Sequence, residues 1–292
     1  MINVPMITLN DGNSIPAIGM GVVFLDEGGN IQNTVDTAIE AGYRLFDNAA
    51  FYGNEEVIGA ALKNNGISRK ELFISTKLKN GHHRFDDACF ECEKSMKKLG
   101  VDYLDLYLIH FPCPEHGLYT QAWKALEHLR KEGYVRSIGL SNFHQEHIEK
   151  ILDMCEFKPV IDQLECNPYL TIEPLRDYLK NNEIVTEAWF PLGGPTVRLD
   201  GQPNPFKEQI MKESILLKMA EKYNKTTAQI ILRWECQSGI IPVPKAATPS
   251  HIFDNINIFD FEMTAEEIAE ISALNADNRC GPSGDTCNEY WE

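Results

Sequence analysis

The chain has no long hydrophobic run. None of the apolar stretches among its 292 residues approaches the roughly 18 consecutive apolar residues that a membrane-spanning helix needs. The first ten residues also lack the basic segment followed by an apolar segment that marks a secretory signal peptide. We therefore expect a soluble cytoplasmic protein that does not act at a membrane.

Positive charge is scarce. The chain has 27 Lys and Arg residues against 43 Asp and Glu residues, which gives a net charge of −16 and a pI of about 4.9. A nucleic acid is an improbable partner for such a surface, because its binding depends on Lys and Arg neutralising the phosphates. One local lysine still suffices to bind a single anionic small molecule, and the overall acidity favours solubility.

The sequence lacks the patterns of disulfide-rich and metal-binding proteins. Eight cysteines in a chain of this length without a secretion signal are expected to be reduced and mostly structural. Cys89 and Cys92 form a CxxC pattern, but it lies within a helical pattern and has no second ligand pair at zinc spacing. His144 and His147 are three residues apart, whereas the HExxH metalloprotease motif needs four. We expect no metal site.

No linker or low-complexity tract divides the chain, so residues 1–292 are expected to form one domain. Short apolar runs alternate with helical patterns, which indicates βαβ units and a parallel sheet. Eight runs favour a (β/α)₈ TIM barrel over an open doubly wound sheet of five or six strands. The runs are Ala17–Gly21, Tyr43–Asp47, Leu72–Lys77, Leu104–His110, Val135–Asn142, Val160–Glu165, Ile184–Phe190 and Ile240–Lys245. The helical patterns are Asn33–Ala41, Asn54–Lys63, Asp86–Leu99, Tyr119–Lys131, Gln145–Met154, Glu173–Lys180, Lys212–Tyr223, Thr227–Gln237 and Thr264–Leu274.

Two segments lie outside this alternation. Ile7–Leu9 and Ser14–Ile15 flank an Asp11-Gly12 turn, which predicts an N-terminal β-hairpin that could plug the bottom of the barrel. The C-terminal tail, residues 275–292, is too interrupted by Gly and Pro for a helix. We expect it to be a loop on the surface.

Chemically distinctive side chains stand at or beside the ends of four of the apolar runs. Asp47, Lys77, His110 and Trp189 stand at these ends, and Tyr52 follows Asp47 in the next loop. Catalytic groups of barrels project from the C-terminal ends of the strands. Each residue alone has a structural explanation, such as helix capping for the aspartate or simple packing for the histidine. Together they would cost desolvation that stability does not require, so we predict an active site there.

Seven motifs resemble the signatures of the aldo-keto reductases, and they follow one another in order along nearly the whole chain. They are Phe46–Glu55, Ser75–Lys77, Leu108–Pro112, Ile138–Phe143, Gln163–Pro168, Ala188–Gly193 and Ile241–Lys245. The tail around Asn278–Pro282 is similar to the compact prokaryotic members, which reduce diketogluconate and glyoxal-type carbonyls. The resemblance implies reversible NAD(P)H-dependent reduction of an aldehyde or ketone to an alcohol.

The resemblance assigns roles to four residues. Tyr52 would be the general acid, and the base in oxidation. A tyrosine pKa of about 10 is too high for efficient proton donation near neutrality, so a neighbouring ammonium must lower it. Lys77 would supply that charge, Asp47 would hold Lys77, and His110 would orient the carbonyl oxygen.

The family binds its dinucleotide without a Rossmann domain, and Gly19-Met20-Gly21 indeed opens no GxGxxG, because position 24 is Phe24. By resemblance, Ser141, Asn142 and Gln163 would hold the nicotinamide carboxamide, while Trp189 would stack on the ring unless it serves barrel packing alone. The remaining cofactor contacts would be Gly21, Val22, Asp47, Phe190, Pro191, Leu192, Lys245, Ala246, His251, Asp254 and Asn255.

The residues expected to bind the adenosine 2′-phosphate, which decide between NADPH and NADH, depart from the family pattern. Lys245 would bind the adenosine 2′-phosphate of NADPH, but Ala246 and His251 replace the usual hydroxyl residue and arginine. Each lost charge-assisted hydrogen bond is worth roughly 1.5–3 kcal/mol. We expect NADPH, with a weakened preference that leaves NADH or dual use open.

The substrate pocket is expected to include Phe24, Tyr52, His110, Phe111 and Trp291, with further walls from Val22, Phe51, Lys79 and Tyr290. A monomer acting on a small carbonyl compound is expected. Two alternatives are a catalytically idle cofactor-binding regulatory subunit on the same barrel, and a metal-dependent hydrolase. The intact Asp47, Tyr52, Lys77 and His110 argue against the first alternative. The second needs more strand-end ligands than Asp47 and His110.

Overall fold

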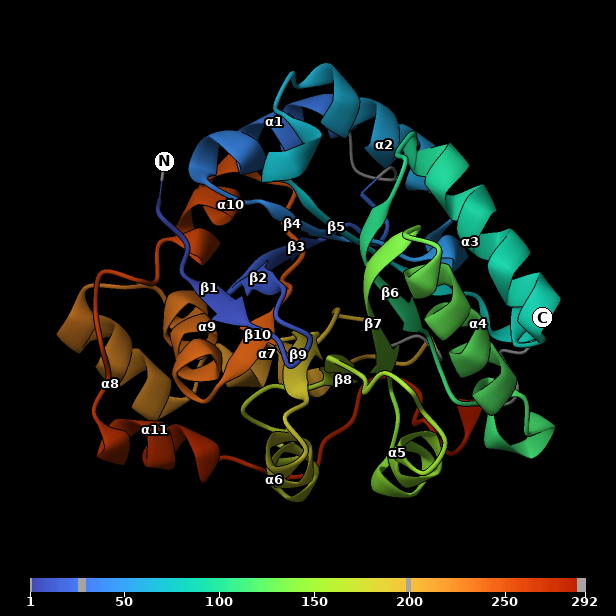
Figure 1. Cartoon of the computed structure of the whole chain (residues 1–292). Helices are drawn as coiled ribbons and strands as arrows, with labels where there is room; N and C mark the ends of the chain where they lie inside the picture. The colour runs from blue at the N-terminus through green and yellow to red at the C-terminus, as the bar shows by residue number, and fades with distance from the viewer. Residues whose placement is uncertain (1, 26–29, 198–200, 288–292) are drawn as a thin grey trace.

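The computed structural model describes residues 2–25, 30–197 and 201–287. Within them, eight parallel strands pair in chain order to form one sheet (Figure 1). The first strand meets the segment after the last through a 3.2 Å hydrogen bond from Gly21 N to Pro244 O, which brings the sheet to a nearly closed barrel. The strands are β3 (Gly19–Gly21), β4 (Leu45–Asp47), β5 (Phe73–Leu78), β6 (Leu104–Ile109), β7 (Val135–Ser141), β8 (Ile161–Glu165), β9 (Val185–Trp189) and β10 (Ile240–Pro242). The predicted (β/α)₈ barrel is confirmed.

Helices surround the barrel (Figure 1). They are α1 (Ile31–Ala41), α2 (Glu55–Asn64), α3 (Phe85–Leu99), α4 (Tyr119–Lys131), α5 (Gln145–Leu152), α6 (Glu173–Asn181), α7 (Pro205–Ile210), α8 (Ser214–Tyr223), α9 (Thr227–Gln237), α10 (Pro249–Ile256) and α11 (Ala265–Ser272). The sequence pattern predicts all of them except α7 and α10. Both begin with proline, which in a sequence is also a signal for a turn or loop.

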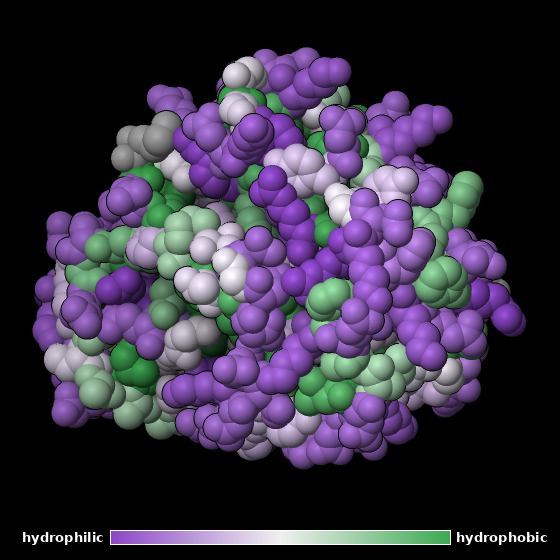
Figure 2. Space-filling model, viewed as in Figure 1, coloured by the Kyte–Doolittle hydropathy of each residue, from purple (hydrophilic) through white to green (hydrophobic). Residues whose placement is uncertain are grey.

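The hydrophobic core has an inner and an outer part. Inside the barrel, Leu45, Leu106, Leu108 and Ile161 pack together, while a larger buried cluster fills the space between strands and helices. The face shown in Figure 2 is mostly hydrophilic, and hydrophobic residues appear on it only in small groups. No helix in the described ranges is long and apolar enough to cross a membrane.

The predicted N-terminal hairpin forms, with β1 (Met6–Thr8) antiparallel to β2 (Ser14–Pro16). Ile15 is buried in the inner barrel cluster. Asn10 Nδ2 donates a 2.8 Å hydrogen bond to Pro159 O, and Asp11 accepts one from Ser137 Oγ. These contacts lie near the amino ends of β7 and β8, so the hairpin covers the bottom of the barrel as predicted.

The C-terminal tail differs from the expected surface loop. It contains no α-helix over its described residues, but Cys280 and Cys287 are buried. Glu165, at the end of β8, accepts hydrogen bonds of 2.7 Å from Cys280 N and 2.9 Å from Gly281 N. A Cβ at Gly284 would lie 1.9 Å from Asn142 O. The described part of the tail, residues 275–287, therefore packs against the C-terminal end of the barrel, where its backbone donors bind the Glu165 carboxylate.

All eight cysteines lie in the described residues, and none forms a disulfide there. Cys92 faces the core from α3, where burial and nearby negative charge raise its pKa, so the CxxC pattern of α3 is structural. Cys113 and Cys287 approach each other, with sulfur atoms 3.5 Å apart. This contact joins the loop after β6 to the tail.

Candidate active site

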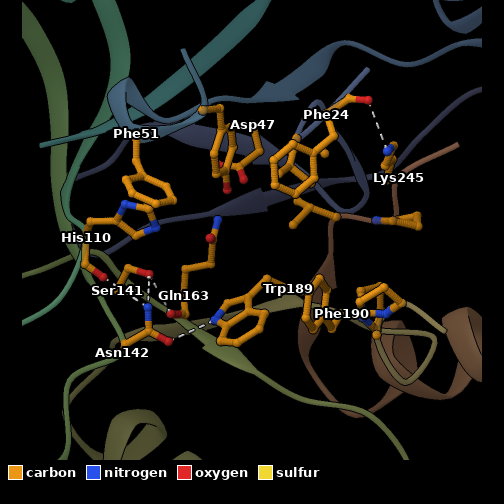
Figure 3. Close-up of a pocket in the computed structure, with 18 of the residues that line it drawn as sticks. Phe24, Asp47, Phe51, His110, Ser141, Asn142, Gln163, Trp189, Phe190 and Lys245 are labelled. Atoms are coloured by element: carbon orange, nitrogen blue, oxygen red, sulfur yellow. Dashed lines mark hydrogen bonds between the residues drawn. The ribbon is translucent and has the colours of Figure 1, made fainter. Parts of the chain in front are cut away.

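Four functional side chains converge at the C-terminal end of the barrel. Asp47 ends β4, Lys77 lies in β5, and His110 directly follows β6. Tyr52 ends a 3₁₀ turn that spans Ala50–Tyr52, just beyond β4. Asp47 and His110 approach one open space from different strands in Figure 3.

Lys77 is the centre of this group. Its ammonium lies 2.9 and 2.7 Å from the two carboxylate oxygens of Asp47 and 2.8 Å from Asn48 O. It also lies 3.4 Å from the hydroxyl of Tyr52. The lysine side chain is fully buried, so Asp47 and Asn48 fix the position of a charge that no water can screen.

The pKa of Lys77 is raised, because the Asp47 carboxylate and Tyr52 together outweigh the opposing effect of burial. Tyr52 also has a raised pKa, since burial dominates and Lys77 only partly lowers it. Lys77 thus acts on the pKa of Tyr52 in the predicted direction, but burial outweighs it and the pKa stays above the ordinary value. Tyr52 stays protonated at neutral pH, which is the state that a general acid requires.

His110 is neutral in this site. Burial and the nearby Lys77 ammonium hold its pKa well below the ordinary value. Its ring meets Phe51 and Tyr52 edge-on, with centroids 6.2 Å apart in both cases. A neutral imidazole in this position can donate one hydrogen bond to a carbonyl oxygen, as predicted for its orienting role.

Ser141, Asn142 and Trp189 form a chain of hydrogen bonds along one wall. Asn142 adopts φ of +63°, and its Nδ2 donates to His110 O at 3.0 Å and to Ser141 Oγ at 2.9 Å. Its Oδ1 accepts a 2.9 Å hydrogen bond from Trp189 Nε1 (Figure 3). Both amide hydrogens of Asn142 are thus committed to the protein, and only acceptor capacity remains for a ligand.

Gln163 completes this wall from β8. Its Nε2 donates a 2.7 Å hydrogen bond to Glu187 Oε2, so its Oε1 is the atom left for the cavity. Ser141 Oγ donates to Gln163 O at 3.0 Å. The acceptor oxygens of Gln163, Asn142 and Ser141 suit a ligand group that carries an NH₂, as a nicotinamide carboxamide does.

A cavity of about 640 Å³ contains these groups. It runs from Tyr52 and His110 to Lys245, whose ammonium donates to Phe24 O at 3.2 Å (Figure 3). Its predicted lining residues are Gly21, Phe24, Asp47, Phe51, Tyr52, His110, Phe111, Ser141, Asn142, Gln163, Trp189, Phe190, Pro191, Leu192 and Lys245. Sequence reasoning missed Val23, Asn80, Gly194, Pro195, Lys207, Val243, Pro244 and Pro282.

Several predicted residues lie elsewhere. Val22 is buried and does not line the cavity, whereas its neighbour Val23 does. Similarly, Lys79 does not line the cavity, whereas its neighbour Asn80 does. Trp291 and Tyr290 fall outside the described residues.

The four predicted adenosine-side residues do not line the cavity. They are Ala246, which is buried, and His251, Asp254 and Asn255, which lie on α10. His251 is exposed, Asp254 is half-buried and Asn255 is buried. Their roles remain predictions.

Asn54 joins two loops at the edge of the site. It precedes α2, yet its side chain does not cap that helix. Its Nδ2 instead donates a 2.8 Å hydrogen bond to Val22 O, which links the loops after β3 and β4. The residue type suited either role, and sequence alone could not show which partner is near.

His147 lies with Glu146 and Asp285 so that three possible ligand atoms come within 4.8 Å of one another. The Nδ1 atom of His147 accepts a hydrogen bond from His144 N. In the neutral ring the proton is then on Nε2, which faces the two carboxylates as a donor. This arrangement fastens the tail to α5 and does not present a ligand lone pair to a metal.

A buried Asp–Lys–Tyr group and a neutral histidine at the mouth of a (β/α)₈ barrel define a proton-donating carbonyl site. The chain matches the model of the Aldo/keto reductase family over residues 29–276. It belongs to this family and is an NAD(P)H-dependent oxidoreductase that acts on carbonyl compounds.

Relatives are similar over nearly their whole length. A glyoxal reductase of Bacillus subtilis is 41% identical over 279 residues, which covers 96% of each chain. A methylglyoxal reductase of Escherichia coli is 40% identical over 286 residues, which covers 98% of each chain. The crystal structure of a Bombyx mori aldo-keto reductase in complex with NADP has a TM-score of 0.86 and 38% identity, and it covers 96% of this chain and 95% of that chain. A Brucella melitensis aldo/keto reductase has a TM-score of 0.85 and 39% identity, with coverages of 94% and 100%.

Proposed function

We propose that this protein uses NADPH to reduce small α-dicarbonyl compounds of the glyoxal type to hydroxycarbonyl compounds. The observation that carries the proposal is the Lys77 ammonium between Asp47 and the Tyr52 hydroxyl, at the floor of a cavity that also contains His110. The glyoxal and methylglyoxal reductases at 41% and 40% identity support the substrate class.

The cavity fits a dinucleotide. At one end, Gln163 and its neighbours present hydrogen-bond acceptors beside the Trp189 ring, which suits a nicotinamide carboxamide. At the other end, Lys245 supplies a cation for a phosphate. Gly21 forms part of the cradle, since a Cβ there would lie 2.8 Å from Val243 O. NADPH supplies the hydride when it is bound here.

The protein's own residues handle the proton. His110 donates a hydrogen bond to the carbonyl oxygen and fixes its direction. Tyr52 gives its hydroxyl proton to the developing alkoxide, and the adjacent Lys77 ammonium stabilises the tyrosinate that remains. Asp47 holds Lys77 charged and in place. In oxidation, the Tyr52 phenolate takes the proton back.

The aromatic lining restricts the substrate. Phe24, Phe51, Phe111 and Trp189 line the cavity near Tyr52. Among the described lining residues, the only lysines are Lys207 and Lys245, and no arginine lines the cavity. We therefore propose that uncharged dicarbonyls, including those with an aromatic substituent, are reduced better than anionic keto-sugar acids such as diketogluconate.

We further propose that the protein prefers NADPH only weakly and acts as a monomer in the cytoplasm. Lys245 favours NADPH, while Ala246 and the exposed His251 weaken the discrimination against NADH. The Asp47, Lys77, Tyr52 and His110 groups all come from one chain, which supports action as a monomer. Eight cysteines without a disulfide support a reducing compartment such as the cytoplasm.

The test is NADPH oxidation, followed by its near-ultraviolet absorbance, with glyoxal, methylglyoxal, phenylglyoxal and diketogluconate. Oxidation with the first three that vanishes in Tyr52→Phe supports the proposal. Preferential reduction of diketogluconate contradicts the substrate class. Activity that survives Tyr52→Phe and requires added metal contradicts the mechanism.

A further inference from the structure

We propose that Lys207 binds the diphosphate of the dinucleotide and so provides a second cationic contact for the cofactor besides Lys245. The inference rests on the proposed use of a nicotinamide dinucleotide. Nothing in the family motifs of the sequence points to Lys207, because it lies in the short helix α7, outside all of them.

Lys207 is built into the wall of the cavity. It stands in the first turn of α7 and lines the same cavity as Tyr52 and Trp189. Its Nζ donates a 2.8 Å hydrogen bond to Leu192 O, in the loop that follows β9. This loop is clamped to α7 a second time, because Asn204 Nδ2 donates to Gly193 O at 2.8 Å. The position of the ammonium is therefore fixed relative to the end of β9.

The charge of Lys207 has no anionic partner among the residues that the structure describes. Its side chain is largely enclosed, yet no carboxylate in the described part of the chain lies within ion-pair distance of its Nζ. An ammonium has three donor hydrogens, and the Leu192 carbonyl takes only one. Burial accordingly lowers the pKa of Lys207. A partly buried cation without a counterion costs free energy that stability does not require, and an anion in the cavity would offset that cost.

The dinucleotide carries anionic groups at two places, the diphosphate and, in NADPH, the 2′-phosphate. Among the described residues that line the cavity, Lys207 and Lys245 are the only ammonium groups apart from the Asp47-paired Lys77 below them. Lys245 follows β10, and Leu192 follows the neighbouring β9, so the two lysines stand at adjacent places on the rim. A dinucleotide that reached from the Trp189 ring to Lys245 would bring its central diphosphate past the Leu192 loop. The geometry thus assigns the 2′-phosphate to Lys245 and the diphosphate to Lys207.

The alternative is that Lys207 only ties α7 to Leu192. Lys207→Gln separates the two roles, because an amide can still donate to the Leu192 carbonyl but carries no charge. Lys207→Met removes both the hydrogen bond to Leu192 and the charge, whereas Lys207→Arg keeps the charge. Lys212→Gln is the matched control, since Lys212 is exposed, also lies near α7 and pairs with Glu208 at 3.0 Å.

The experiment measures dissociation constants of the full-length protein by calorimetry for NADPH, NADH and adenosine 2′-monophosphate, which has no diphosphate. We expect Lys207→Gln and Lys207→Met to weaken the binding of NADPH and of NADH by the same factor, about tenfold to a hundredfold, because one charge-assisted contact is lost. Adenosine 2′-monophosphate should bind as before, and Lys207→Arg and Lys212→Gln should resemble the wild type.

Three results would overturn the inference. Unchanged affinities of Lys207→Gln would show that the charge makes no contact. A loss of affinity for NADPH alone would show that Lys207 contacts the 2′-phosphate and not the diphosphate. A loss that includes adenosine 2′-monophosphate, or that appears in Lys207→Met but not in Lys207→Gln, would indicate a structural role. Failure of the wild-type protein to bind either dinucleotide would instead contradict the proposed function itself.

Discussion

Glu187 Oε2 accepts a 2.7 Å hydrogen bond from Gln163 Nε2 inside the barrel, between paired positions of β8 and β9. Both side chains are buried. Burial and the charge of Asp47 raise the pKa of Glu187 to about 8. The carboxyl group that holds Gln163 is therefore mostly neutral at pH 7.

Glu187→Gln should change how stability depends on pH. Unfolded Glu187 loses its proton near its ordinary pKa of 4.5, but folded Glu187 keeps it to about pH 8. The folded state thus binds more protons between these values, and stability falls as pH rises through this window, by at most about 1.4 kcal/mol per pH unit. The stability of the Glu187→Gln variant should fall less steeply as pH rises, which thermal unfolding at pH 6 and pH 9 would show. The exposed Glu221→Gln is the control, and identical slopes in all three proteins would refute the shifted pKa.

Tyr52→Phe should abolish proton donation but leave the cofactor site intact. We expect kcat to fall by about 10² to 10⁴, the usual contribution of a general acid, while the dissociation constant for NADPH stays within about twofold of the wild-type value. Rapid-mixing single-turnover measurements would separate chemistry from product release. A Tyr52→Phe enzyme with near-normal single-turnover rates would rule out this residue as the acid.

Removing Lys77 should destabilise the fold through its partner. Lys77→Met leaves the Asp47 carboxylate buried without its 2.7 Å ion-pair partner, which should cost about 3–5 kcal/mol. The double variant with Asp47→Asn should recover part of that loss, because no charge is then left unpaired. Urea unfolding of both single variants and the double variant provides the coupling energy. Strict additivity of the two losses would contradict a direct pair.

His110 should not titrate in the usual range of histidine. Since its pKa lies well below the ordinary value, kcat/KM for reduction should show no inflection near pH 6.5. Profiles from about pH 5.5 to 7.5 for wild type and His110→Gln would test this. An acid-side inflection that disappears only in the variant would show that the imidazole is charged in the working site.

Cofactor preference should respond to position 251. His251 is exposed at the start of α10, where the family pattern has an arginine. His251→Arg should raise kcat/KM for NADPH relative to NADH by about tenfold, because a guanidinium can bind the 2′-phosphate through two hydrogen bonds. Lys245→Met should shift the ratio the opposite way. If neither substitution changed this ratio, the 2′-phosphate would have to bind elsewhere.

The sequence predicted the barrel because short apolar runs alternate with helical patterns, and Asp47, Lys77 and His110 stand at or beside the ends of three of the strands. Lys207 escaped prediction, because α7 is only six residues long and its position depends on how the loop after β9 folds back. That path includes Phe190 at φ +52°, a backbone state that few non-glycine residues adopt and that pattern reading does not anticipate. The pKa of Tyr52 also escaped prediction, because it depends on the depth of burial and not only on the neighbouring charge.

The way in which the tail is held has a consequence for protein engineering and for divergence. Glu165 accepts hydrogen bonds from the backbone N–H groups of Cys280 and Gly281, so this part of the attachment does not depend on the side chains of these two residues. Gly281 and Gly284 are the constrained positions, because a Cβ at either would collide with Trp189 or with Asn142. Pro282, between these two glycines, lines the cavity, so substitutions at this position can reshape the cavity while the barrel and its proton-donating residues stay unchanged.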